Sequence, residues 1–246
     1  MVSDSREPPT PALVRTARAV PATHAFAWYR EAMRLWKRGP ATFGILALAT
    51  LAVEFTLTLI PNGGALLAQI AVPLAACGLL YGSLAADRGG RPRLGDFIAI
   101  VGAPPRAMMA VIASGVIVFA AEALTAYAVD RINMLAPTSS DEITPGVAFA
   151  IYTVGIAVSL PFTFVPFGAL FDGLSLRDSF AQSMRGFAAN LAPMCVYGLL
   201  SLVLLLFGSA TFAVGFLLAL PWWAASSYAA WKDIFGVAAG SDAREF

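Results

Sequence analysis

The chain has 246 residues, of which 59% are hydrophobic and only 13% charged, and its formal net charge is +1. Soluble domains carry about 45–50% apolar and about 25% charged residues, so this composition excludes an ordinary soluble enzyme and also a disordered chain. No basic stripe stands apart from the apolar segments, and we therefore expect no nucleic-acid partner. We expect instead an all-α integral membrane protein.

Six apolar runs are long enough to cross the hydrocarbon core of a bilayer, which is about 30 Å thick. They lack the alternating pattern of a transmembrane barrel, so each run predicts a helix. The fifth and sixth runs are nearly continuous, and Gly208 with Ser209 is the expected turn between them. The predicted spans cover residues 42–60, 64–86, 107–129, 147–169, 191–207 and 211–230 of a membrane domain over 23–236, with a disordered tail at 1–22 and a second tail at 237–246.

The distribution of Lys and Arg predicts the orientation of these spans. With the N-terminus in the cytoplasm, all but one of the 16 basic residues lie in cytoplasmic segments, and the exception is Arg131. An excess of basic residues in short loops is typical of the cytoplasmic side. Residues 1–22 lack the apolar stretch of a signal peptide. We therefore expect both termini in the cytoplasm and insertion directed by the first span.

A weak threefold repeat underlies the six spans. Each unit would consist of an amphipathic leader that ends at a proline, followed by a helical hairpin whose second span contains a proline and ends near an aspartate. The leaders cover residues 28–36, 94–101 and 176–187. The prolines and aspartates of the returning spans are Pro73 and Asp87, Pro161 and Asp172, and Pro221 and Asp233.

The first leader carries aromatic and other apolar residues on one face and basic residues on the opposite face, and the third leader likewise has one apolar face. This pattern is typical of helices that lie in the headgroup plane and meet anionic phosphates. We expect the leaders to be interfacial, either as simple anchors of the spans or as a rim that binds anionic phospholipids or a protein partner. The candidate rim residues are Arg30, Arg34, Lys37, Arg38, Arg88, Arg91, Arg93, Arg177 and Arg185.

Two carboxylates lie inside predicted spans, Glu54 in the first and Glu122 in the third. Ionisable residues inside a membrane are costly and are candidates for function by default. Both lie about 10 Å below the outer interface, given about 1.5 Å of rise per helical residue. If the two spans touch, the glutamates would share a proton or hold a cation. Otherwise, each would bond a neighbouring Ser, Thr or backbone group.

The sequence favours neither catalysis nor a bound metal or cofactor. The single histidine, His24, has no neighbours with metal-ligand spacing. Cys77 and Cys195 likewise form no metal or redox motif, and no phosphate-binding loop, nucleophile elbow or zinc-protease motif occurs. Pro161 and Pro166 make the fourth span the most broken, and broken helices line binding sites in some transporters.

The stretch from Trp28 to Pro40 and the ending Tyr228-Ala-Ala-Trp-Lys-Asp-Ile-Phe-Gly236 resemble a family of uncharacterised multi-pass inner-membrane proteins of proteobacteria. Residues 160–191 are similar to the central segment of that family, so the resemblance covers about residues 24–236. It implies a bacterial inner-membrane location. The family has no established activity or catalytic residues that the resemblance could transfer to this chain.

Three functions fit these patterns. The first is a non-enzymatic accessory, scaffold or assembly subunit of a larger membrane complex, because catalytic groups are missing while residues suited to helix contacts are plentiful. The second is a small proton- or cation-linked transporter or channel that uses Glu54 and Glu122, and the third is a phospholipid-interacting protein. A transporter requires the two glutamates to face one cavity, whereas a scaffold does not.

Overall fold

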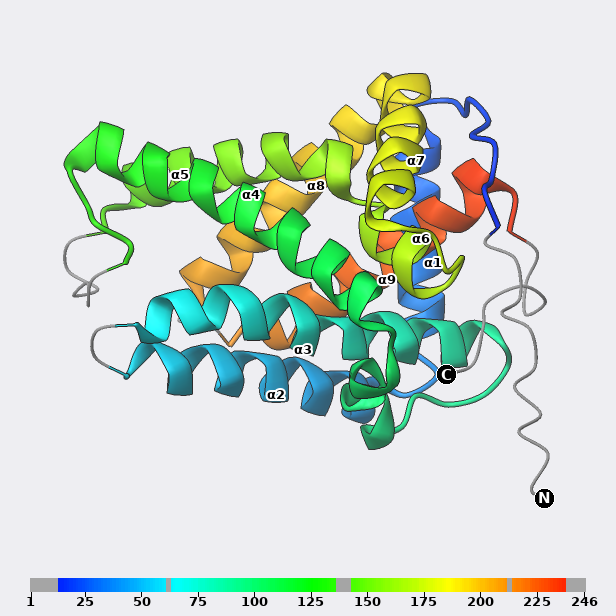
Figure 1. Cartoon of the computed structure of the whole chain (residues 1–246), viewed down its shortest axis with the longest axis horizontal. Helices are drawn as coiled ribbons and strands as arrows, with labels where there is room; N and C mark the ends of the chain where they lie inside the picture. Colours follow the sequence, from blue (N-terminus) through cyan, green and yellow to red (C-terminus); the bar gives the residue numbers. More distant parts are fainter. Residues whose placement is uncertain (1–12, 61–62, 136–142, 212–213, 238–246) are drawn as a thin grey trace, which may run out of the picture.

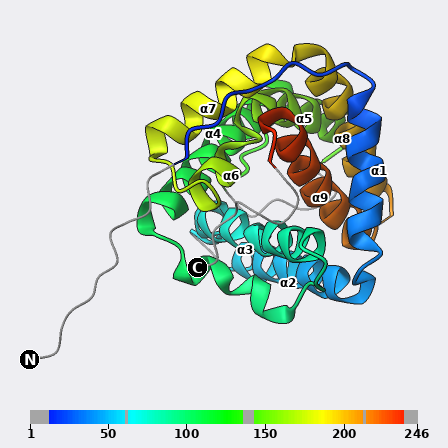
Figure 2. The same ribbon diagram turned by 90° about the vertical axis from the view of Figure 1, so that its right-hand side faces the viewer.

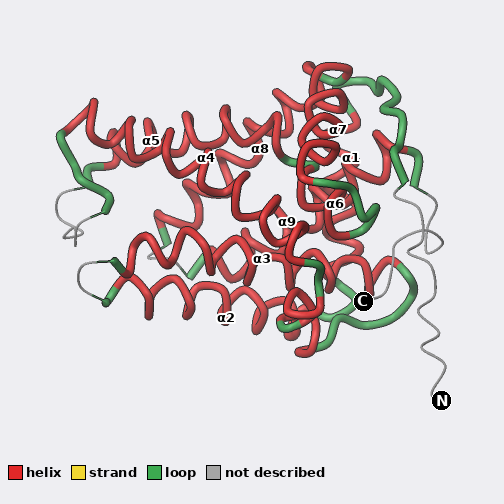
Figure 3. The backbone as a smooth tube through the Cα atoms, in the orientation of Figure 1, coloured by secondary structure: helices red, strands yellow, loops and turns green. Residues whose placement is uncertain are grey.

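A computed structural model describes residues 13–60, 63–135, 143–211 and 214–237. These residues form helices and loops without any strand (Figure 3), which confirms the all-α fold. Five helices among them are long and apolar enough to cross a membrane, which indicates a membrane-embedded protein. They are α2 (Pro40–Thr58), α3 (Gly64–Asp87), α4 (Pro105–Asp130), the run Pro145–Leu170 and α8 (Leu191–Ala210).

The sixth predicted span corresponds to α9 (Phe216–Phe235), which is not one of these five helices. Its first half is apolar, but its second half contains Ser226, Ser227, Lys232 and Asp233. Figure 2 shows α9 at the centre of the molecule, with the other helices around it. Residues 225–231 are all buried, so protein surrounds this part of α9 on every side.

The long helices run roughly along one axis, and two shorter helices lie across them at one end (Figure 1). These are α1 (His24–Trp36) and α7 (Leu176–Ala189). The short turns η1 (Leu94–Phe97) and η2 (Ala99–Gly102) lie near the same end. We call this the basic end, because α1, α7 and residues 88–93 carry the candidate rim. The element order is that expected for three leader–hairpin units: α1 before α2 and α3, η1–η2 before α4 and α5, and α7 before α8 and α9.

The turn predicted at Gly208 and Ser209 is wrong, because α8 continues to Ala210. Gly208 instead gives room for the ring of Phe216, which a side chain at position 208 would overlap. A glycine near the end of an apolar run signals either a turn or a close approach of two helices, and here it serves the close approach.

The fourth span is broken as expected. It consists of α5 (Pro145–Ser159), η4 (Leu160–Phe162) and α6 (Val165–Leu170). The break leaves backbone groups without helical partners, and Ser183 of α7 replaces two of those partners. Its hydroxyl donates to the carbonyl of Pro161 at 2.7 Å and accepts from the amide of Phe164 at 3.0 Å. Side-chain hydroxyls are a usual way to satisfy the backbone of a broken membrane helix.

Replacing Ser183 with alanine is expected to lower the free energy of unfolding by about 1–3 kcal/mol, because a buried carbonyl and a buried amide lose their partner. Reversible unfolding in mixed detergent micelles measures the change. Thr153→Ala is the matched control, since that exposed hydroxyl bonds only the carbonyl of Phe149 in its own helix, and a change within about 0.5 kcal/mol is expected. Equal losses in the two variants would contradict the role of Ser183.

Residues 13–22 differ from the disordered tail expected there. They run in extended form along α7 and over the end of α9 (Figure 2). The amides of Arg15 and Val20 donate to the side chains of Gln182 at 2.9 Å and Asn190 at 2.8 Å, and the amide of Arg18 donates to the carbonyl of Ile234 at 2.8 Å. Partners far away in the sequence therefore order this segment. Residues 1–12 and 238–246, which complete the two predicted tails, lie outside the described residues.

The first leader also differs from the interfacial helix that we expected. In α1, Ala25, Trp28, Ala32 and Leu35 are buried in the protein core instead of facing lipid. The hydroxyl of Tyr29 bonds Ser201 of α8 at 2.8 Å, and burial raises the pKa of Tyr29 to about 12. The apolar pattern of α1 is real, but the protein itself supplies its apolar surroundings.

Candidate functional site

A cavity of about 440 Å³ lies between the α2–α3 hairpin and the α4–α5 hairpin. Glu54 of α2 and Glu122 of α4 both line it. Gln69 of α3 and Tyr152 of α5 add further polar groups, and the rest of the lining is mainly apolar. The structure thus places the two carboxylates at one cavity, which is the arrangement that the transporter hypothesis requires.

No Lys, Arg or His is among the described residues that line this cavity. Glu54 and Glu122 therefore face this cavity without a basic partner among its described lining residues. Two carboxylates that share an apolar site without a basic partner repel one another unless a proton or a cation lies between them. The chemistry of the cavity therefore favours binding of a proton or a small cation and disfavours an anion.

Small residues and hydroxyl groups position the two hairpins around the cavity. Gly155 of α5 leaves the space that the carboxylate of Glu122 occupies, because a side chain at position 155 would overlap it. Gly115 of α4 similarly receives the ring of Pro73 from α3. The hydroxyl of Tyr152 bonds that of Ser209 at 2.7 Å and ties α5 to α8. These close contacts of α3, α4 and α5 hold the two hairpins together beside the cavity.

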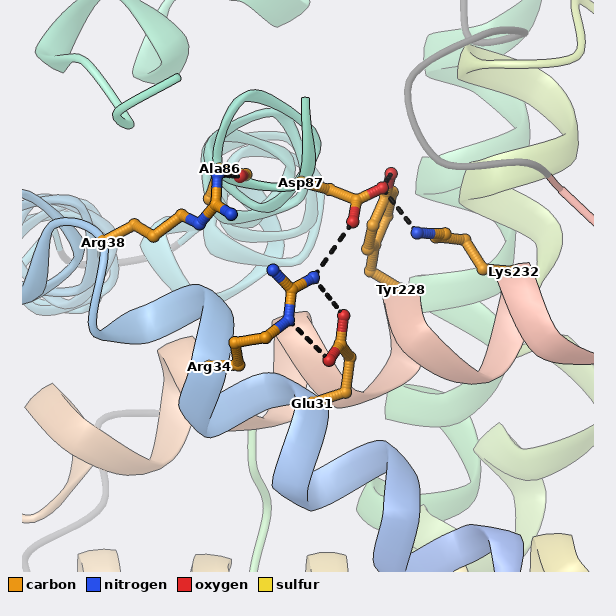
Figure 4. Close-up of polar contacts among 7 residues, drawn as sticks. All are labelled: Glu31, Arg34, Arg38, Ala86, Asp87, Tyr228 and Lys232. Atoms are coloured by element: carbon orange, nitrogen blue, oxygen red, sulfur yellow. Dashed lines mark hydrogen bonds and ion pairs between the residues drawn. The ribbon is translucent and has the colours of Figure 1, made fainter. Parts of the chain in front are cut away.

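A second polar cluster lies at the basic end and surrounds Asp87, the last residue of α3 (Figure 4). The Asp87 side chain is only 1% exposed. Lys232 of α9 donates to it at 2.6 Å, and the hydroxyl of Tyr228 donates at 3.0 Å. Arg34 of α1 approaches it at 3.3 Å and also pairs with Glu31. This cluster joins α1, α3 and α9 through one buried carboxylate.

The aspartates at the ends of the other two returning spans are held in the same manner. Asp172 is fully buried and pairs with Arg15 at 2.8 Å. Asp233 accepts from His24 at 2.7 Å and from Trp28 at 2.9 Å, and it pairs with Arg18. Desolvation acts to raise the pKa of Asp233, but the hydrogen bonds from these residues outweigh it, and the pKa lies below its usual range.

In the sequence, these three aspartates stand out only as marks of a repeat. The sequence does not reveal that each one pairs with a basic side chain. Their partners Arg15 and Arg18 lie in the segment predicted to be disordered, more than 150 residues away along the chain. No local pattern links such distant residues. The charged groups that line a second cavity, of about 570 Å³ between α1 and α9, are members of these same clusters.

The candidate rim does not form one continuous site. Arg34 is engaged with Glu31 and Asp87, and Arg38 donates to the carbonyl of Ala86 at 2.8 Å, so both bind within the protein. Arg88 is half-buried. Besides Arg34, the exposed members are Arg30 on α1, Lys37 directly after it, Arg91 and Arg93 before η1, and Arg177 and Arg185 on α7.

Among the described residues, no group of three or more His, Cys, Asp and Glu is placed to hold a metal ion, and Cys77 is buried while Cys195 is exposed. Comparison with known proteins gives no match, whether to a family model, to a curated protein or to a solved structure.

Proposed function

We propose that this protein is a small proton- or cation-linked transporter or channel of a bacterial inner membrane, in which Glu54 and Glu122 form the cation-binding site. The single observation that carries the proposal is that both carboxylates line one cavity between two hairpins. The absence of basic residues among the lining residues described supports a cationic ligand. In this proposal the chain is not an enzyme and requires no cofactor.

The proposed topology has six spans with both termini in the cytoplasm. The excess of Arg and Lys at the basic end supports a cytoplasmic location for that end. Helix α9 returns from the opposite end to the basic end (Figure 1), which supports its assignment as the sixth span. The glutamate cavity would then lie in the periplasmic half of the bilayer.

A membrane-permeant carbodiimide tests the site directly, because it modifies protonated carboxyl groups in apolar surroundings. We expect peptide mass spectrometry to find labelling at Glu54 or Glu122 in the purified full chain in liposomes, and Na⁺, K⁺ or raised pH to reduce it. Glu31, which faces water beside Arg34, is the internal control and should stay unlabelled. Labelling of neither glutamate, or labelling that no cation and no pH change affects, would overturn the proposal.

One observation, the low burial of α4, favours the accessory-subunit hypothesis as a second candidate. Only 17% of the membrane-spanning window of α4 is buried within the protein. Exposed residues of this helix, among them Met109, Val116 and Leu124, present apolar surface to lipid or to another subunit. Recovery of a stoichiometric partner from native membranes in mild detergent would favour this second candidate, and recovery of the chain alone would count against it.

A further inference from the structure

Helix α7 presents its polar side to the protein. Its buried residues are Ser179, Gln182, Ser183 and Gly186. Gln182 donates to Asp172 at 3.2 Å and accepts from the amide of Arg15, while Ser183 satisfies the backbone at the break of the fourth span. These specific bonds fix the rotation of α7 about its own axis.

The apolar stripe of α7 consequently lies at the edge of the core, where Phe180 and Phe187 pack against it. Leu176 and Met184 are 41% and 45% exposed, and Phe180 and Phe187 are half-buried. A surface helix of a soluble protein buries such a stripe against its own core. Because the polar face of α7 already occupies that position, Leu176 and Met184 require another apolar environment.

The second leader shows the same exposure. Leu94, Ile98 and Val101 follow one another at helical spacing along η1 and η2, and Ile98 and Val101 are 65% and 76% exposed. On the other side of this segment, Ile100 is buried in the core. Arg91, Arg93 and Arg106 flank the exposed residues and are themselves exposed.

Both segments lie at the basic end, and α7 runs across the long helices (Figures 1 and 2). An amphipathic helix in this orientation is parallel to the plane of the bilayer, with its apolar stripe at the boundary between headgroups and acyl chains. Exposed Arg177 and Arg185 provide positive charge on α7. Apolar side chains beside exposed arginines match the chemistry of an anionic phospholipid.

We propose that α7 and the η1–η2 segment together form a surface that binds anionic phospholipids of the leaflet at the basic end. In contrast, α1 takes no part in this surface, because its apolar residues Trp28 and Leu35 are buried in the protein. The surface shares no residue with the described lining of the glutamate cavity. Failure of the transport proposal would therefore leave the lipid surface unaffected, and the reverse also holds.

Spin labels on single cysteines test whether the stripe enters the bilayer. The full chain with Cys77→Ala and Cys195→Ala receives Met184→Cys, Ile98→Cys or, as a water-facing control, Arg30→Cys. In vesicles that contain phosphatidylglycerol, labels at 184 and 98 are expected to collide more with oxygen than with a water-soluble nickel chelate, and the label at 30 should do the opposite. Labels at 184 and 98 that report water would overturn the proposal.

Native mass spectrometry tests the preference for anionic lipid. Arg177→Ala combined with Arg185→Ala is expected to lower the retention of phosphatidylglycerol at least about fivefold, because a cation near an anionic surface contributes about 1 kcal/mol. Arg30→Ala combined with Lys37→Ala removes the same charge from α1 and should change retention less than about twofold. Equal changes in the two pairs, or no change in the first, would contradict a defined lipid surface.

Discussion

Glu54→Gln and Glu122→Gln are each expected to lower cation flux into proteoliposomes at least about tenfold. A unit charge about 4 Å from a bound cation contributes about 4 kcal/mol at an effective dielectric constant of about 20, and the loss of only 1.4 kcal/mol lowers affinity about tenfold. Glutamine keeps the size of the side chain and removes its charge. Fluxes of H⁺, Na⁺ and K⁺ along imposed gradients, followed with trapped dyes, measure the effect.

The double variant should be little worse than either single variant, because two residues of one site do not act additively. Glu31→Gln is the control, since Glu31 pairs with Arg34 at the basic end and does not line the cavity between the hairpins. It should retain the flux of the parent chain. The transport proposal would be contradicted if both cavity variants carried the same flux as the parent chain, or if the parent chain carried none of the three ions.

Asp87→Ala is expected to lower the free energy of unfolding by about 3–5 kcal/mol, the usual effect of removing one partner of a buried ion pair. The substitution leaves Lys232, which is mostly buried, without its carboxylate and leaves the hydroxyl of Tyr228 without an acceptor. It also removes the ion pair that links α3 to α9 at the basic end. Reversible unfolding of the purified protein in detergent measures the loss.

Glu31→Ala is the matched control for Asp87, because it removes a carboxylate from the same cluster at an exposed position. An exposed ion pair contributes about 0–1 kcal/mol, so this variant should be nearly as stable as the parent. If the two variants lost similar stability, Asp87 would not be the centre of the cluster.

The long helices could be predicted from the sequence because length and apolar composition alone define them. The role of α9 could not, since an apolar run does not reveal whether lipid or protein surrounds it. The order of residues 13–22 was equally hidden, because it depends on Gln182, Asn190 and Ile234, which are distant in the sequence. Gly208 was misassigned because glycine serves both turns and close packing.

Part of the candidate site was also predictable. Glu54 and Glu122 stand out as carboxylates within apolar runs, but their shared cavity depends on how two hairpins pack. The amphipathic leaders were visible in the sequence, whereas the direction each one faces was not. Helix α1 buries its apolar residues, while α7 buries Gln182 and Ser183 and leaves Met184 exposed. That difference arises from the polar partners available to each helix.

Cysteine cross-linking tests most directly whether Glu54 and Glu122 line one cavity and so form a single site. In a chain with Cys77→Ala and Cys195→Ala, the pair Glu54→Cys and Glu122→Cys would be treated with a short bifunctional thiol reagent in sealed vesicles. Leu124→Cys replaces Glu122→Cys in the control, because Leu124 lies on α4 at similar depth and is exposed to the outside. We predict an intramolecular cross-link for 54 with 122 and none for 54 with 124. Equal yields in both pairs, or no cross-link in either, would contradict the shared cavity.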